Sequence, residues 1–331
     1  MSPTRVPSEA VVIDALRLAC RAPSLHNSQP WRWVVTDQCV ELFADPARLM
    51  RGADNSGREA LISCGAALHH FRVAMAAAGW ATPVHRFPDE RDRLHLASVE
   101  FAPVEAVSAE QQRRADAILL RHTERAPLAA PHDWDPTSGI LQTFTSARAV
   151  RVDHLTDDDR ATLSEASLLA DLLRSADAFY QQELASATAG FSAQDGIPRA
   201  ALVSDDQRQH VDVGRTFRVN PIPQRYGRVA DDRAAVLLLS TVDDSHDSVL
   251  RCGETLSAVL LDATAAGMAT CTVSHVTELS SGRDVLAALV GNRSIPQVLV
   301  RVGRVSILKP PPPATPRRSV DDVVEIRRGT R

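Results

Sequence analysis

The residues in this chain most suited to binding a ligand form one short run, Ala22–Trp31, which reads APSLHNSQPW. Its closely spaced polar side chains are Ser24, His26, Asn27, Ser28 and Gln29. An amphipathic helix, residues 11–21, is predicted before the run, and a β-rich stretch, residues 32–36, follows it. Amide and hydroxyl groups on a loop held between a helix and a strand can read the edge of a flat heterocycle. The alternative is a polar connection that stops the helix at Pro23.

This run resembles the Pro-Ser-x-x-Asn-x-Gln-Pro-Trp loop of the nitroreductase-like flavoproteins, which lies along the isoalloxazine ring and ribityl chain of FMN. The whole chain resembles the Acg-type, dormancy-associated subfamily, in which two nitroreductase-type halves share one polypeptide. The resemblance implies one non-covalent FMN per chain. It assigns the contacts to the ring and ribityl chain to Pro23, Ser24, His26, Asn27, Gln29 and Trp31.

A second motif, Arg121–Arg125 (RHTER), ends a predicted helix, residues 111–121, just before Pro127. It resembles the Arg-Arg/His-Ser-x-Arg element by which nitroreductases hold the FMN phosphate. A phosphate dianion needs fixed cations, and the planar fork of arginine can donate two parallel hydrogen bonds to it. The alternative is a solvated helix end with arginines near the last carbonyls. With the tail cations that the family also supplies, the phosphate end is assigned to Arg121, His122, Thr123, Arg125, Arg317 and Arg318.

Two Ala-rich segments, residues 64–82 and 252–270, align without a gap at an offset of 188 residues. Each predicts an apolar helix that ends at a glycine, and the ungapped register favours duplication over convergence. The polar motifs are not duplicated, because the first half, residues 1–110, holds the loop and the second half, residues 111–331, holds the arginine motif. Since nitroreductase dimers hold each flavin between subunits, we predict one flavin site between the two halves.

The resemblance also places the turn after the second Ala-rich helix near N5 of the flavin. Residues 267–274 are therefore a candidate wall of the pocket, with Gly267 and Thr270 as contacts. Cys271 lies in this stretch and has no sequence sign of an activated thiolate. No residue is assigned a catalytic role.

The predicted elements alternate irregularly between helices and strands, which indicates an α+β fold. The resemblance specifies it as a nitroreductase-like fold in which tandem-duplicated halves form a pseudo-dimeric monomer. The first half holds helix 11–21, strands 32–36 and 39–43, helix 61–79 and a strand near 94–101. The second holds helix 111–121, strand 149–153, an interrupted or kinked helix 157–185, strand 234–241, helices 249–267 and 282–290, and strand 297–305.

Composition sets limits on compartment and partners. The net charge of −4 over 331 residues gives no case for nucleic acid or an anionic membrane. Five cysteines without a C-x-x-C pair favour neither a disulfide framework nor a metal site. The absence of a signal-like start and of an 18-residue apolar run predicts a cytoplasmic chain. We expect a monomer or a weak homodimer.

Residues 186–230 lack strong periodicity, which indicates either disorder or a functional lid. In Acg-like proteins the corresponding segment is understood to fold over the flavin. We therefore expect a protein that sequesters or stores FMN under this lid. One alternative is an NAD(P)H-dependent, FMN-mediated reductase of nitro compounds or quinones. NAD(P)H would bind to it only transiently, because the chain has no G-x-G-x-x-G motif for a permanently bound nicotinamide. The other alternative is a cofactor-free scaffold.

Overall fold

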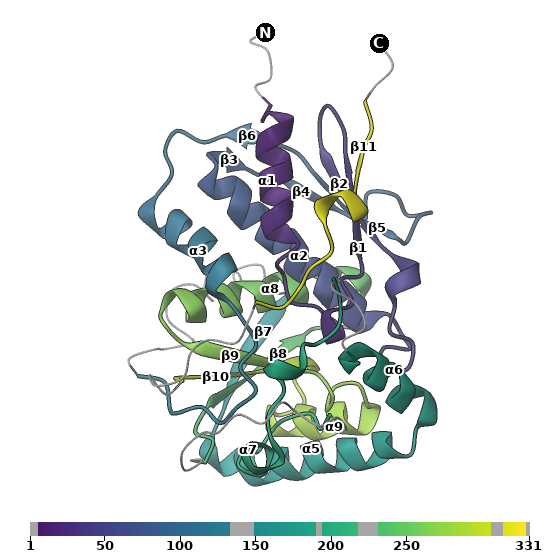
Figure 1. Ribbon diagram of the computed structural model, residues 1–331, viewed down its shortest axis with the longest axis vertical. Helices are drawn as coiled ribbons and strands as arrows, with labels where there is room; N and C mark the ends of the chain where they lie inside the picture. The colour runs from purple at the N-terminus through teal and green to yellow at the C-terminus, as the bar shows by residue number, and fades with distance from the viewer. Residues whose placement is uncertain (1–5, 133–148, 190–193, 218–230, 306–313, 329–331) are drawn as a thin grey trace.

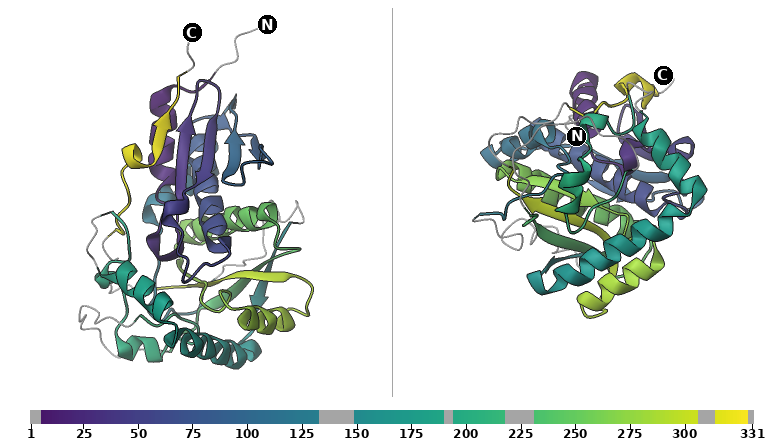
Figure 2. Two further views of the ribbon diagram at one scale, coloured as in Figure 1. Left: turned by 90° about the vertical axis from the view of Figure 1, so that its right-hand side faces the viewer. Right: turned by 60° about the horizontal axis from the view of Figure 1, so that its bottom comes forward.

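The computed structural model describes residues 6–132, 149–189, 194–217, 231–305 and 314–328. Two β-sheets lie one above the other with helices between them (Figures 1 and 2). The first sheet has the order β11-β1-β2-β5-β4. Its strands are β1 (Trp31–Val35), β2 (Val40–Ala44), β4 (Val84–Arg86), β5 (His95–Val99) and β11 (Val324–Ile326).

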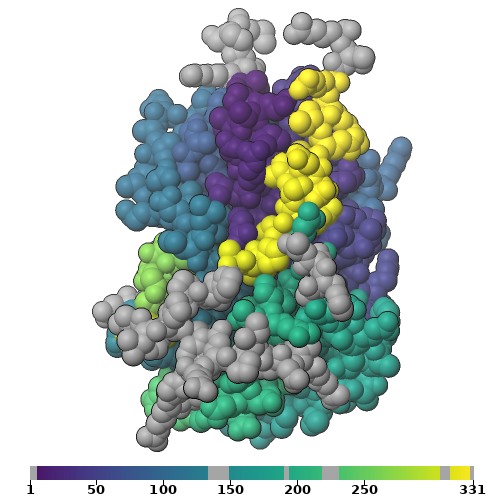
Figure 3. All heavy atoms as spheres, in the orientation of Figure 1, coloured from purple at the N-terminus to yellow at the C-terminus, as the bar shows by residue number. Residues whose placement is uncertain are grey.

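The C-terminal tail returns to this first sheet. β11 pairs in parallel with β1, and Val35 lies opposite Ile326. In the space-filling view the tail runs down the surface of the N-terminal helix toward the middle of the molecule (Figure 3). Residues near the C-terminus are therefore placed beside the loop that follows this helix.

The second sheet is antiparallel throughout, in the order β7-β8-β10-β9. Its strands are β7 (Val150–Leu155), β8 (Ala235–Thr241), β9 (Ala269–Val273) and β10 (Ile295–Gly303). Successive side chains of β8 serve opposite faces, as strand geometry requires. Leu237 and Leu239 join the core that includes the central helices, whereas Leu238 packs in a separate cluster with Leu163 and Leu286 of the outer helices. A small third sheet pairs β3 (Trp80–Ala81) with β6 (Ala102–Pro103).

The helices form a layer between the sheets and a layer outside the second sheet (Figure 1). Those packed near the first sheet and in the centre are α1 (Glu9–Ala19), α2 (Arg58–Ala77), α3 (Ala109–Leu120) and α8 (His246–Ala265). Those beside the second sheet are α5 (Arg160–Ser175) and α9 (Ser280–Leu289). α6 (Ala178–Thr188) packs against the region of Leu25 and Ala53, and α7 (Asp205–Gln209) lies in the segment 194–217.

The two central helices, α2 and α8, touch backbone to backbone. A Cβ atom on Gly65 would lie 2.1 Å from the carbonyl oxygen of Leu250, and a Cβ on Gly253 would lie 2.1 Å from that of Ile62. Only glycine allows this approach, because every other residue carries the Cβ. Among the described residues α2 is the one helix long and apolar enough to cross a membrane, but 83% of that stretch is buried inside the protein, as core helices also are.

We expect Gly253→Ala to lower the free energy of unfolding by about 1–3 kcal/mol, because the new methyl group must displace the backbone of α2. Helix propensity alone has the opposite sign and favours alanine by about 1 kcal/mol. Urea unfolding measures the difference. Ala265→Ser, at an exposed position of the same helix, is the control and should change stability little; a stabilised Gly253→Ala protein would contradict the close crossing.

The α+β prediction is confirmed, and the long helices lie where the sequence pattern places them. The predicted face of α1, including Val12 and Leu16, is buried. The predicted helix 157–185 is interrupted, one of the two predicted alternatives, because Asp177 caps the start of α6. The short strands β3, β4, β6 and β11 lie outside the predicted strands. The proline run 310–313 and lid residues 190–193 and 218–230 lie outside the described residues.

Candidate functional site

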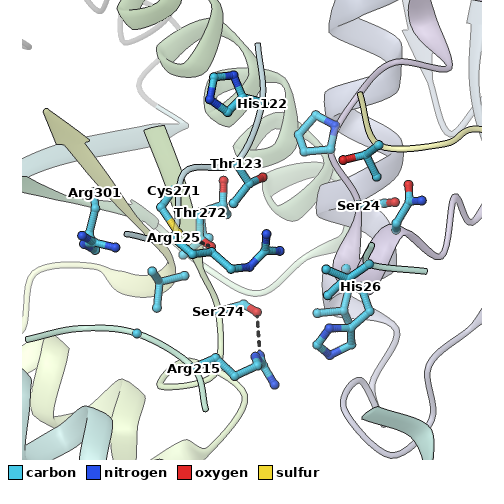
Figure 4. A pocket seen from close by; sticks show the side chains of 18 of the residues that line it. Ser24, His26, His122, Thr123, Arg125, Arg215, Cys271, Thr272, Ser274 and Arg301 are labelled. Atoms are coloured by element: carbon cyan, nitrogen blue, oxygen red, sulfur yellow. Dashed lines mark hydrogen bonds between the residues drawn. The ribbon is translucent and has the colours of Figure 1, made fainter. Parts of the chain in front are cut away.

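A cavity of about 550 Å³ lies where the two sheets and the central helices meet. Its walls come from distant parts of the sequence, as Figure 4 shows. The loop after α1 and the first turns of α2 form one side, and β9 and β10 form another. Nine of the fourteen predicted site residues line it: Pro23, Ser24, His26, Asn27, Arg121, His122, Thr123, Arg125 and Arg317.

The loop after α1 is held in a tightly constrained conformation. His26, Asn27 and Gln29 have φ angles of 49°, 61° and 52°, in the left-handed region that non-glycine residues seldom adopt. The Gln29 amide donates to Ser24 Oγ at 3.0 Å, and the Leu25 amide donates to Ser63 Oγ of α2 at 3.2 Å. Backbone strain of this kind persists where surrounding contacts fix it, and it clusters at ligand sites.

Gln29 does not line the cavity; it ties three segments together. Its Nε2 donates to the carbonyl of Gln194 at 2.8 Å, and its Oε1 accepts from the Arg318 amide at 2.9 Å. Asn27 acts similarly, since its Nδ2 donates to the carbonyls of Gly196 and Pro316. The polar loop therefore binds the segment 194–217 and the C-terminal tail.

Trp31 is also absent from the cavity wall. It is fully buried on β1 in the main hydrophobic core. Strand alternation turns its side chain inward toward the helices, so it is not among the residues that line the cavity.

Three arginines gather at one end of the cavity: Arg21, Arg121 and Arg317. The guanidinium groups of Arg121 and Arg317 both donate to the carbonyl of Arg21, at 3.4 and 3.1 Å. We call these three residues the arginine cluster. No ion pair with a carboxylate is formed by any of them among the described residues.

The arginine cluster is electrostatically unfavourable without an anion. Burial, together with repulsion from Arg121 and Arg21, lowers the pKa of Arg317 to about 9. Burial and Arg21 lower the pKa of Arg121 to about 10. Within the described part of the chain, the Nε atoms of Arg121 and Arg317 are buried without a hydrogen-bond partner. Buried cations without a counter-charge are costly, so this end of the cavity is suited to an anion.

Arg125 lies apart from that cluster, although it belongs to the same motif. Its Nη1 donates to the carbonyl of Ala201 at 3.2 Å, and its guanidinium lies 5.6 Å from the ring centroid of Phe217. Arg318 does not line the cavity either, since its side chain extends toward Asp45 and the carbonyl of Asp322. The six residues predicted for a phosphate are therefore divided among separate places.

The predicted wall from the second half, residues 267–274, contributes only its last four residues to the cavity. Cys271, Thr272, Val273 and Ser274 line the cavity from β9 and the turn that follows it. Thr270 does not line it; its carbonyl accepts from the Glu124 amide at 2.8 Å and so fixes the arginine motif beside β9. Gly267 ends α8 with a φ of 78° and is outside the wall, because its role is to terminate the helix. Burial raises the pKa of the Cys271 thiol.

Several residues that line the cavity belong to no motif that could be recognised in the sequence. Glu59, Ser167, Arg208 and Arg215 all line it. Arg215 donates to Ser274 Oγ at 3.1 Å and forms a buried ion pair with Glu278, whose side chain is fully inaccessible. Partners 63 residues apart leave no spacing pattern to read.

His26 is buried beside these cations. Burial lowers its pKa well below the usual value, and Arg215 and Arg125 lower it further, so the imidazole is neutral near pH 7. Its ring meets that of Phe217 edge-on, with centroids 6.3 Å apart. Among the described residues, no group of three or more His, Cys, Asp or Glu side chains could hold a metal ion.

No family model matches the chain. A Mycobacterium tuberculosis protein named "Putative NAD(P)H nitroreductase acg" is 51% identical to it over 325 residues, which cover 98% of each chain. A second protein of that organism, also named a "Putative NAD(P)H nitroreductase", is 38% identical over 328 residues, covering 97% of this chain and 93% of its own length.

A solved structure supports the fold. A crystal structure from Anabaena variabilis, described as that of a "putative nitroreductase", superposes with a TM-score of 0.50 at 10% identity. The superposition covers 89% of this chain and 73% of that one. Fold and full-length identity agree: this chain belongs to the Acg-type, nitroreductase-like family.

Proposed function

We propose that the chain binds one FMN non-covalently in the cavity, with the phosphate on the arginine cluster. The observation that carries this proposal is the cluster itself, in which cations repel one another at the edge of a cavity. A phosphate dianion would replace that repulsion with charge-assisted hydrogen bonds. His122 and Thr123, which follow Arg121 in the chain and also line the cavity, would add two further donors.

The rest of the cavity suits a planar ring. Its volume lies within the range of small-molecule sites, ~300–1,000 Å³. With the phosphate on the arginine cluster, the ring would extend between the His26 side and the β9 wall, toward Arg125. In that position the ring would lie near polar lining residues of both sides, among them Ser24, Thr272 and Ser274. FMN, when bound, supplies the capacity to accept and donate a hydride.

We further propose that the segment 194–217 covers the bound flavin, so that the protein sequesters or stores FMN. Ile197, Val203, Val211 and Phe217 from this segment line the cavity. One end of the segment is held by Gln29 and Asn27 and by the Arg48–Asp195 ion pair, with N and O 2.7 Å apart. The other end is held by Arg215 and by the Thr216 amide, which donates to Asp171 at 3.1 Å.

The cavity's position supports the proposal of two fused halves with one site between them. The close contacts of α2 and α8 relate equivalent positions: Gly65 meets Leu250 as Gly253 meets Ile62, both at the offset of 188. His69 Nδ1 and Ser257 Oγ, also 188 residues apart, lie within 2.7 Å. A duplicated chain of this kind would need no second subunit to complete its site, and we propose a cytoplasmic monomer.

An NAD(P)H-dependent reductase of nitro compounds or quinones is the second candidate. The names of the two Mycobacterium tuberculosis relatives favour it. The two functions differ in access to the flavin. A reductase must let the nicotinamide of NAD(P)H reach the flavin, whereas a protein that stores FMN under a cover keeps the nicotinamide away from it.

Rapid mixing of the FMN-loaded protein with NADPH separates the candidates. We expect the flavin absorbance to persist on mixing with NADPH and to bleach on mixing with dithionite, which is small enough to enter. Purified protein should be yellow, with one flavin per chain. Rapid bleaching by NADPH, followed by reoxidation on adding a nitroaromatic compound, would establish the reductase instead; protein that stays colourless after incubation with FMN would refute the cofactor proposal.

A further inference from the structure

Glu59 is a buried carboxyl on the cavity wall to which neither the sequence nor the proposed function assigns a role. It lies in the first turn of α2 and is 5% exposed. Its carboxylate accepts a hydrogen bond from Arg58. Its carbonyl accepts from Ser63 Oγ at 2.7 Å, and the same Oγ accepts from the Leu25 amide. Glu59 is therefore one helical turn from the loop proposed to lie along the flavin.

The charges around Glu59 come from three other segments and do not balance. Asp54 lies before α2, where it accepts from the Ala60 amide at 2.8 Å. Glu278 and Arg215 approach from the turn after β9 and from the segment 194–217. Arg58, on the same helix, is itself occupied by the carbonyl of Gln297.

Three carboxyl groups thus face two guanidinium groups. If all five were ionised, the group would carry a net negative charge away from solvent, which is unfavourable. A proton on one of the three carboxyl groups would remove that charge. Burial, with added repulsion from Glu278 and Asp54, raises the pKa of Glu59 to about 7, so this carboxyl can exchange a proton near neutral pH.

We propose that Glu59 is a redox-linked proton site: it takes up a proton when the flavin in the cavity is reduced and releases it when the flavin is reoxidised. This inference rests on the proposed function, since it requires FMN in the cavity. Two electrons and one proton, delivered together as hydride by a nicotinamide or separately by dithionite and water, give a reduced flavin with one negative charge. That charge, inside the cavity that Glu59 lines, favours the protonated carboxyl.

The proton also fits the chemistry of an acceptor. Reduction of a nitro group to a nitroso group and water consumes two electrons and two protons. The reduced flavin anion supplies both electrons and one proton as it returns to the oxidised state. The second proton would come from Glu59, and a quinone would need the same single proton to become its hydroquinone. A group with a pKa near the working pH is suited to this exchange.

The test is the midpoint potential of bound FMN measured against pH, because its slope counts the protons taken up per two electrons. Above pH 7, we expect the wild-type protein to take up one proton more than Glu59→Gln. Asp262→Asn is the matched control: Asp262 is a half-buried carboxyl paired with Arg114 at 2.9 Å, with a pKa raised to about 6 by burial, and it does not line the cavity. It should keep the wild-type slope.

Equal slopes in wild type and Glu59→Gln would overturn the inference while leaving FMN binding intact, whereas failure of the wild-type protein to bind FMN would overturn the proposed function and this inference with it. Infrared difference spectra of the wild-type protein give a second readout that requires no variant to fold. Reduction above pH 7 should produce the C=O stretch of a protonated carboxyl; its absence would also overturn the inference.

Discussion

Arg121→Met should weaken FMN binding by roughly 30- to 4,000-fold. The reason is that losing one partner of a charge-assisted pair costs about 2–5 kcal/mol, and each 1.4 kcal/mol is a factor of about ten in affinity. Methionine keeps an unbranched apolar side chain of similar length and removes only the charged group. Quenching of FMN fluorescence on titration into the flavin-free protein measures the dissociation constant.

The same substitution should stabilise the flavin-free protein. Without an anion, Arg121 is repelled by Arg21 and Arg317, and its removal relieves that repulsion. A residue that serves only the fold would lower stability and affinity together. Opposite changes in affinity and in the free energy of unfolding are therefore the signature of an anion site.

Arg318→Met is the matched control, because Arg318 is the neighbour of Arg317 but extends toward Asp45 outside the cavity. Its FMN affinity should stay close to that of the wild type. If Arg121→Met bound FMN with wild-type affinity, the phosphate would not lie on the arginine cluster.

Glu278→Gln should lower the free energy of unfolding by about 3–5 kcal/mol, the usual cost of leaving one member of a buried ion pair without its partner. Burial alone lowers the pKa of Arg215, but Glu278 and Tyr180 raise it above the usual value, so the guanidinium stays charged in every ordinary buffer. Urea unfolding measures the loss of stability.

Function should change with stability, because Arg215 holds one end of the segment proposed to cover the flavin. We expect FMN to dissociate faster from Glu278→Gln and NADPH to reduce it more rapidly than in the wild type. Arg48→Met breaks the more exposed Arg48–Asp195 pair, whose side chains are 23% and 35% exposed, and should cost only about 0–1 kcal/mol.

The double variant Arg215→Met/Glu278→Gln should recover part of the lost stability, since it removes the unpaired buried charge. If the Glu278→Gln protein released FMN and reacted with NADPH as slowly as the wild type, this segment would not control access to the flavin.

The sequence by itself determined the features that depend on local order. The α+β class followed from periodicity, because an amphipathic helix such as α1 or an apolar strand such as β8 can be recognised from the residue pattern of one continuous segment. The family followed from two short motifs, residues 23–31 and 121–125. The structure brings most of their side chains to one cavity, although the motifs are almost 100 residues apart in the chain.

Only the tertiary structure decided which of those side chains face the cavity. Motif membership did not separate Arg121, which joins Arg21 and Arg317, from Arg125, which lies against Phe217. Nor did it show that Gln29 ties the loop to two distant segments. The direction of a side chain depends on the backbone conformation around it, and the left-handed angles of this loop are fixed by contacts from elsewhere.

The short edge strands and the buried ion pairs could not be predicted either, because they too depend on contacts between distant segments. Short edge strands such as β11 contain too few residues to show a period and form only because β1 offers an open edge. The Arg215–Glu278 pair and the group of charges around Glu59 join residues from separate elements. Their energies arise from burial and from long-range Coulomb interactions, which exist only once the chain has folded and excluded water.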